Sequence, residues 1–203
     1  MKKTMINLVL PSVLTIIALM GIGSACTPTP DPTPTCDDAT PVMQDLFTNF
    51  DAEADYYMWP MDLERHEYKF KSSVDGQICA LGYQSYQQTT PWAVDNSGVS
   101  YTLEIVGGPS VTQTFSNAVP EYVSVTPFDI VAGQEYTIRR TGGDGLDASS
   151  GRSTRPVDYT NVSFPITRGN ITFTASTYYD VVGNGGPVNS ISIPQILFEF
   201  VEN

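Results

Sequence analysis

Apolar residues alternate with polar residues over much of the chain after Glu67, and this period of two restricts the fold more than any other feature. Tyr68 and Phe70 alternate with charged residues, and the apolar residues of segment 99–105 alternate with Ser, Thr and Glu. Turn signals such as Asp75-Gly76 separate these short segments. The pattern predicts about nine or ten strands in an all-β, jelly-roll-like antiparallel β-sandwich.

The remaining segments predict little helix and two long loops. Thr40 and Pro41 are suited to cap and begin one short helix, and we expect at most this one. Segments 141–159 and 178–188 are rich in glycine and are expected to be loops. The Ile, Leu and Phe residues of segment 191–201 predict a closing strand.

The N-terminus has the three parts of a secretory signal: two lysines, an apolar run over residues 7–23, and small residues before Cys26. A transmembrane anchor is the alternative, but a spanning helix needs about 20 apolar residues. This run is shorter and contains Pro11. Cys26 directly follows the small residues, which resembles a bacterial lipobox with an acylated (palmitate-type) cysteine. We therefore expect residues 1–25 to be a lipoprotein signal peptide.

The lipid would anchor the protein in the outer membrane, on its periplasmic or cell-surface face, because Thr27 stands where an inner-membrane retention signal would have Asp. Residues 26–38 are expected to form a lipidated stalk, and residues 39–203 a single domain. Alternating Thr and Pro in the stalk favour extended polyproline II of roughly 28 Å.

With Cys26 acylated, Cys36 and Cys79 remain as a pair in an oxidising compartment. They could form a disulfide, and two free thiols are the alternative.

The chain is acidic, with 22 Asp and Glu against 10 Lys and Arg and a formal net charge of −12. This composition disfavours nucleic acid as a ligand, because binding it requires a basic surface.

His66 is the single histidine and lies in a charged run, so we expect it to be solvated. One histidine excludes a His-cluster metal site and disfavours a Ser-His triad, and no Gly-x-Ser-x-Gly motif is present. We therefore expect no enzyme, although glycosidase chemistry needs only two carboxylates.

The region from Tyr68 to Arg140 combines a strand, an Asp-Gly hairpin, a second strand, a long loop, three strands and an Ala-Gly turn before an aromatic strand. The residues concerned are Phe70, Asp75-Gly76-Gln77-Ile78, Leu81-Gly82-Tyr83, Tyr101-Thr102-Leu103, Phe115, Tyr122-Val123-Ser124-Val125, Val131-Ala132-Gly133 and Tyr136. In this order and spacing, the region resembles a family of uncharacterised bacterial β-sandwich modules in exported proteins, sometimes found beside carbohydrate-active domains. The family often has Trp where Tyr122 stands. The resemblance implies a β-sandwich and a non-catalytic surface module, and it transfers no functional residue.

Two groups of aromatic side chains are candidate ligand contacts. Tyr86 and Trp92 lie in a polar loop between strands, and Tyr178, Tyr179 and Asp180 begin the second Gly-rich loop. An aromatic ring can bind the apolar face of a pyranose while amides and carboxylates bond its hydroxyls. The commoner alternatives are that Trp92 packs under its own loop and that the tyrosines serve core or rim packing.

Four arginines lie in or just before the first Gly-rich loop. Arg139 and Arg140 precede it, and Arg152 and Arg155 lie inside it. Such a cluster could bind a carboxylate, as on a uronic acid, or the acidic surface of a partner. Local neutralisation of nearby aspartates is the favoured alternative.

Segment 142–147 of the same loop looks like one copy of a calcium-binding Gly-Asp turn. Asp144 and Asp147 would supply part of the six to eight oxygens that calcium takes, and Asp158 could add one. A flexible loop is the favoured alternative, and we expect no other cofactor.

Together these features predict a non-catalytic surface lipoprotein, anchored by its N-terminal lipid, whose β-sandwich binds a glycan or serves as an accessory subunit of an outer-membrane assembly. One alternative is a structural or adhesion protein that binds another protein, for example by sheet-edge pairing. The least favoured alternative is a glycan-active enzyme.

Overall fold

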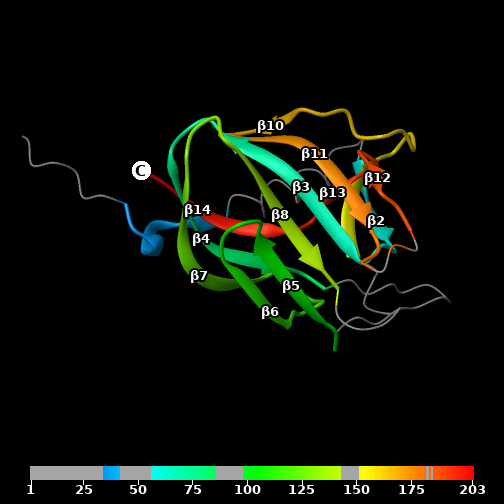
Figure 1. The fold of residues 1–203 in the computed structure, drawn as a ribbon, viewed down its shortest axis with the longest axis horizontal. Coiled ribbons are helices and arrows are strands. Elements are labelled where there is room, and N and C mark those ends of the chain that lie inside the picture. Colours follow the sequence, from blue (N-terminus) through cyan, green and yellow to red (C-terminus); the bar gives the residue numbers. More distant parts are fainter. Residues whose placement is uncertain (1–33, 42–55, 86–97, 143–150, 182, 184) are drawn as a thin grey trace, which may run out of the picture. The chain divides into compact units, whose positions relative to one another are not determined.

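β-Strands make up most of the regular structure in this computed structural model, which describes residues 34–41, 56–85, 98–142, 151–181, 183 and 185–203 (Figure 1). Within these ranges there are 14 strands in three antiparallel sheets. The predicted all-β antiparallel sandwich is confirmed, with more strands than the sequence pattern indicated. No helix in the described ranges is long and apolar enough to cross a membrane.

The first sheet has four strands, in the order β1 (Thr40–Pro41), β14 (Leu197–Glu202), β4 (Gly76–Tyr83) and β7 (Glu121–Ile130). β4 is central, and seven of its eight residues are buried. Both of its faces carry apolar side chains, as expected for a strand covered on both sides.

The second sheet has seven strands and shares one core with the first. Its order is β10 (Ile166–Arg168), β11 (Ile171–Tyr179), β3 (Arg65–Ser72), β8 (Glu135–Thr141), β5 (Ser100–Ile105) and β6 (Ser110–Thr114), with β12 (Val188–Asn189) paired to β11. Ring contacts join the two layers. The Phe70 ring centroid lies 5.3 Å from that of Phe198, and the Tyr101 centroid lies 5.0 Å from that of Tyr83. The two sheets therefore pack face to face.

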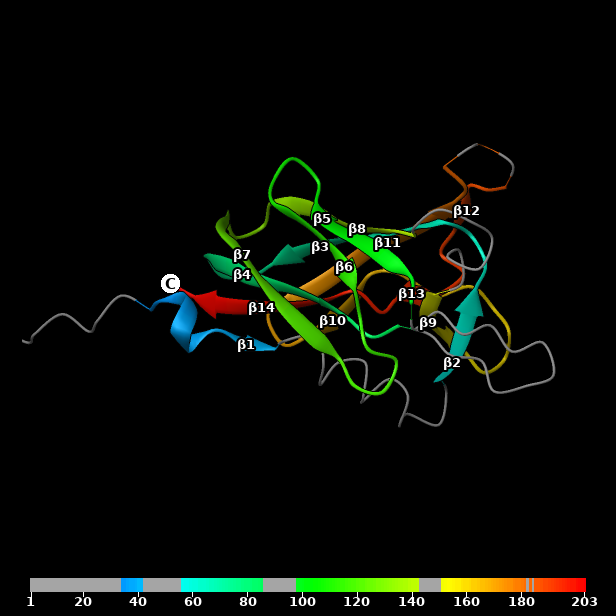
Figure 2. The same cartoon turned by 90° about the horizontal axis from the view of Figure 1, so that it is seen from below.

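A third, smaller sheet consists of β13 (Ile193–Pro194), β9 (Gly151–Pro156) and β2 (Tyr56–Met61). Figures 1 and 2 show it at one end of the sandwich, while β1 and the short 3-10 helix η1 (Cys36–Asp38) lie at the other end. The backbone N–H of Arg152 donates to the Tyr83 hydroxyl at 3.4 Å, which ties β9 to the end of β4.

A disulfide joins Cys36 of η1 to Cys79 of β4, with the two Cα atoms 5.5 Å apart. The expected pairing is therefore present in the structure. It fastens the beginning of the described chain to the central strand of the first sheet. The two cysteines are 43 positions apart in the sequence, and the chain between them includes β1, β2 and β3.

A polar cluster is buried where β3, β8 and β11 approach the small sheet. His66 is fully buried, so the prediction that it is solvated is wrong. Its Nε2 lies 2.8 Å from the Leu63 carbonyl and its Nδ1 lies 3.4 Å from Arg140 Nη1. Burial, reinforced by the Arg140 cation, holds the pKa of His66 well below its ordinary value. His66 is therefore a neutral imidazole that donates through Nε2.

Several local predictions are wrong. Thr40 and Pro41 form an edge strand, where a proline is tolerated, so the helix does not begin there; the rest of that segment lies outside the described residues. The loop predicted over 141–159 contains β9, and β2 was not predicted at all. Tyr178 and Tyr179 belong to β11 and not to a loop. The closing strand is divided into β13 and β14.

Candidate functional site

The small sheet and the turn after β9 bring together the half-buried Tyr56, Tyr57 and Trp59 and the exposed Tyr159. β2 and β9 pair in register, so that Tyr57 lies opposite Arg155 and Tyr56 opposite Pro156. Because successive strand residues face opposite sides, these two pairs point to opposite faces of the sheet. Each face carries its own group of side chains.

On one face, three aromatic rings cluster together, and a guanidinium group contacts two of them. Tyr57, Trp59 and Tyr159 have ring centroids 5.8–6.4 Å apart and interplanar angles of 61–89°. The Cζ of Arg155 lies 4.9 Å from the Trp59 centroid and 5.5 Å from that of Tyr159. Edge-to-face rings and cation–π contacts are favourable geometries. The arginine therefore fixes the orientation of this aromatic cluster (Tyr57, Trp59, Tyr159 and Arg155).

Tyr159 is held in a conformation that costs energy. Its φ is 61°, in the left-handed region, and the residue is 66% exposed. That backbone costs an L-residue about 1–2 kcal/mol. Two hydrogen bonds hold it: its N–H donates to the Pro156 carbonyl at 3.2 Å, and its carbonyl accepts from Arg155 Nη2 at 2.8 Å. A strained, exposed aromatic residue with such support is typical of a ligand contact.

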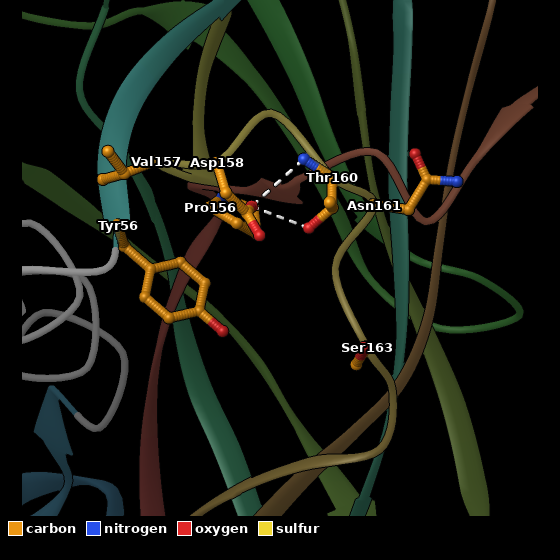
Figure 3. Close-up of a pocket in the computed structure, with 7 residues that line it drawn as sticks. All are labelled: Tyr56, Pro156, Val157, Asp158, Thr160, Asn161 and Ser163. Atoms are coloured by element: carbon orange, nitrogen blue, oxygen red, sulfur yellow. Dashed lines mark hydrogen bonds between the residues drawn. The ribbon is translucent and has the colours of Figure 1, made fainter.

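On the other face, a groove with a volume of about 480 Å³ opens beside Tyr56 (Figure 3). Its lining residues are Tyr56, Pro156, Val157, Asp158, Thr160, Asn161 and Ser163. Asp158 Oδ1 accepts two hydrogen bonds from Thr160, from the side-chain hydroxyl at 2.7 Å and from the N–H at 3.1 Å. These bonds lower the pKa of Asp158. The carboxylate is thus ionised and fixed in orientation at neutral pH.

Buried polar contacts position the small sheet under this site. Ser153 of β9 lies 3.2 Å, oxygen to oxygen, from the Tyr178 hydroxyl, which also accepts from Ser192 at 2.7 Å. On the other side of β9, Gln195 donates to Thr154 at 3.0 Å. Gly151 allows β9 to approach closely, because a Cβ there would overlap Arg140 Nη1. The sheet is therefore fixed by specific hydrogen bonds.

Two pairs of neighbouring residues were predicted as ligand contacts: Arg139 with Arg140, and Tyr178 with Tyr179. In each pair the structure buries one residue completely. Arg140 and Tyr178 are fully buried, so neither lies at a surface as that prediction requires. Arg139 faces outward but forms ion pairs with Glu67 and Glu104. Burial is the main cause that raises the pKa of Tyr178, which is a neutral phenol in the cluster.

Tyr179 and Asp180 line a second hollow of about 340 Å³ at the end of β11. The Tyr179 hydroxyl donates to Glu67 at 2.7 Å, and the Arg65 guanidinium lies 4.8 Å over its ring. Asp180 accepts from the Glu64 N–H at 3.3 Å. Both residues are therefore near a surface hollow, but the Tyr179 hydroxyl and Asp180 Oδ1 already have partners within the protein.

The other predicted site residues lie outside the described residues: Cys26 for lipidation, Tyr86 and Trp92 for ligand contact, and Asp144 and Asp147 for calcium. Among the residues that the structure describes, no group of three or more His, Cys, Asp and Glu side chains is placed to hold a metal ion. Asp158, considered as a further calcium ligand, contacts Thr160 and lines the groove.

Sequence reasoning missed the aromatic residues of β2, although Tyr56-Tyr57-Met58-Trp59 places three aromatic residues within four positions. That density was the available signal for a surface rich in aromatic rings. Tyr159 carried no comparable signal, because its exposure depends on the turn that follows β9. No protein-family model matches the chain, and none of the curated proteins or solved structures compared with it matches either, so the function must be argued from the geometry of this site.

Proposed function

We propose that the protein is a non-catalytic surface lipoprotein that binds a glycan at the small sheet. The observation that carries this proposal is Tyr159, which is strained, 66% exposed and packed against two further aromatic rings. On the opposite face of the same sheet, the groove offers the Tyr56 ring together with a carboxylate, three hydroxyls and an amide. Rings for the apolar face of a pyranose and a few fixed polar groups for its hydroxyls are the features that a sugar site requires.

The location of the site agrees with a tethered protein. The N-terminal segment joins the described domain at η1, and the small sheet lies at the opposite end (Figures 1 and 2). With Cys26 acylated, the chain would be tethered on the N-terminal side of η1. The likeness to exported modules found beside carbohydrate-active domains also favours a glycan ligand.

The test is titration of the soluble Cys26→Ser chain against a glycan panel, with Tyr159→Asn and Trp59→Ala as site variants. Asn accepts a positive φ well, so Tyr159→Asn removes the ring without adding backbone strain. We expect each variant to weaken binding by about tenfold, by analogy with nucleobases, whose stacking on an aromatic side chain contributes about 1–3 kcal/mol. Val131→Ala is the control, because Val131 is an exposed apolar residue outside this site. A flat response to the whole panel would rule out the proposal.

A protein partner is the second candidate, and β7 favours it. This strand has ten residues, lies at the edge of its sheet and pairs only with β4 among the described strands. An unpaired strand edge can accept a strand from another protein. Pull-down from membranes in the presence of competing glycans separates the two functions, because capture by β7 would be indifferent to the sugar.

A further inference from the structure

We infer that the groove selects uncharged sugars with neighbouring hydroxyls over uronic acids and other anionic sugars, and that Asp158 is the residue that determines this specificity. The inference rests on the proposed glycan-binding function. It disagrees with one possibility raised by the arginines around the first Gly-rich loop, namely that they bind a carboxylate such as that of a uronic acid. Three features of the described residues support it.

The first feature is the charge that faces the groove. Of the seven described residues that line the groove, Asp158 is the one that is charged at neutral pH, and none of the seven is basic. Its Oδ1 is occupied by the two hydrogen bonds from Thr160. The second carboxylate oxygen lies on an exposed side chain at the edge of the hollow shown in Figure 3. A carboxylate held in this way can accept hydrogen bonds from sugar hydroxyls, and such charge-assisted bonds are about twice as strong as neutral ones.

The second feature is the position of Arg155, the basic residue that precedes Pro156 in β9. Arg155 lies opposite Tyr57, whereas the groove is lined by Tyr56 and Pro156. Strand alternation therefore directs Arg155 to the other face of the small sheet. There its guanidinium contacts the rings of Trp59 and Tyr159 and donates to the Tyr159 carbonyl. Arg155 thus acts as a positioning residue for Tyr159 and does not offer its charge to a ligand in the groove.

The third feature is the charge of the whole chain. A formal net charge of −12 repels an approaching anionic polysaccharide. Two like unit charges about 4 Å apart in water repel by about 1 kcal/mol, or roughly fivefold in affinity. Partial exclusion of water from the groove would increase that penalty. An uncharged sugar meets no such repulsion and gains the hydrogen bonds to Asp158.

The experiment compares matched neutral and carboxylated oligosaccharides of equal length, such as those from galactan and galacturonan, by calorimetric titration of the Cys26→Ser chain. We expect the neutral ligand to bind at least about fivefold more tightly, with a gap that narrows at high salt because screening weakens the repulsion. Asp158→Asn should weaken neutral binding by about tenfold and strengthen acidic binding by about fivefold.

Asp129→Asn is the matched control. Asp129 also accepts a hydrogen bond from a neighbour, Gln77, but it lies at the end of β7 that pairs with the beginning of β4. This variant removes one negative charge and should change neither affinity by more than about twofold. Equal changes in both Asp variants would show that net charge, and not the groove, sets the preference.

Three outcomes overturn the inference. Tighter binding of the acidic oligosaccharide, or of a cationic amino sugar over a neutral one, would contradict selection of uncharged sugars while leaving glycan binding intact. Unchanged neutral affinity in a folded Asp158→Asn variant would remove Asp158 from the site. Failure to bind any sugar would overturn the proposed function together with this inference.

Discussion

Removal of the Cys36–Cys79 disulfide should lower the free energy of unfolding by about 4 kcal/mol. The bond closes a 43-residue loop, and the loop-entropy relation gives about 3 kcal/mol for 15 residues and about 4.7 kcal/mol for 100. The perturbation is Cys36→Ser with Cys79→Ala in the soluble Cys26→Ser chain. Alanine suits position 79 because this residue is 4% exposed and a hydroxyl there would need a partner.

The assay is urea unfolding followed by tryptophan fluorescence and circular dichroism. With a slope of about 2 kcal/mol per molar urea, the midpoint should fall by about 2 M. The reduced Cys26→Ser chain is the control and should behave like the double variant. Hydrogen exchange should also rise in β2, which lies inside the closed loop and is bonded on one side to β9. A midpoint shift below about 0.5 M would refute the loop-entropy reasoning for this protein.

Three further changes test other parts of the structure. Cys26→Ser should release a folded, soluble domain from membranes; retention in the membrane fraction would disprove the lipid anchor. Gly151→Ala should destabilise the protein by about 1–3 kcal/mol, measured by thermal unfolding, because its Cβ would overlap Arg140 Nη1. Acid should destabilise the wild type below about pH 6.5, by up to about 1.4 kcal/mol per pH unit, because unfolded His66 binds a proton that the folded form excludes. A His66→Gln variant should lose this slope in urea titrations at several pH values.

The sequence pattern predicted the strands whose buried residues are apolar. β3 buries Tyr68 and Phe70 and exposes Lys69 between them, so its period of two is visible in the sequence. β9 has the sequence Gly-Arg-Ser-Thr-Arg-Pro and buries Ser153 and Thr154 on opposite faces. Hydrogen bonds to Tyr178 and Gln195 compensate for that burial. Because those partners are distant in sequence, no local pattern could identify β9, and the site that it carries was missed with it.

One face of β11 is buried, and neighbouring residues in a strand face opposite sides, so one of Tyr178 and Tyr179 lies on that buried face. Simple alternation from Ile171 and Phe173 would bury Tyr179. Instead, a bulge between Phe173 and Ala175 shifts the pairing with β3 by one residue. From that point the inward residues are Ser176 and Tyr178. A bulge is set by the register of the partner strand, so the sequence of β11 alone could not show which tyrosine reaches the surface.

Sugar affinity and folding stability should depend differently on pH. Asp158 remains ionised because hydrogen bonds from Thr160 lower its pKa, and His66 remains neutral in the folded protein because burial beside Arg140 lowers its pKa. Neither group therefore changes its charge in the folded state between about pH 8 and pH 6. Sugar affinity should be constant over that range, even though stability starts to decline as the pH approaches 6, because the unfolded chain takes up the proton. Affinity and urea midpoint measured on the same samples test this separation. A binding transition centred near about pH 6.5 would show instead that an accessible histidine takes part in ligand binding.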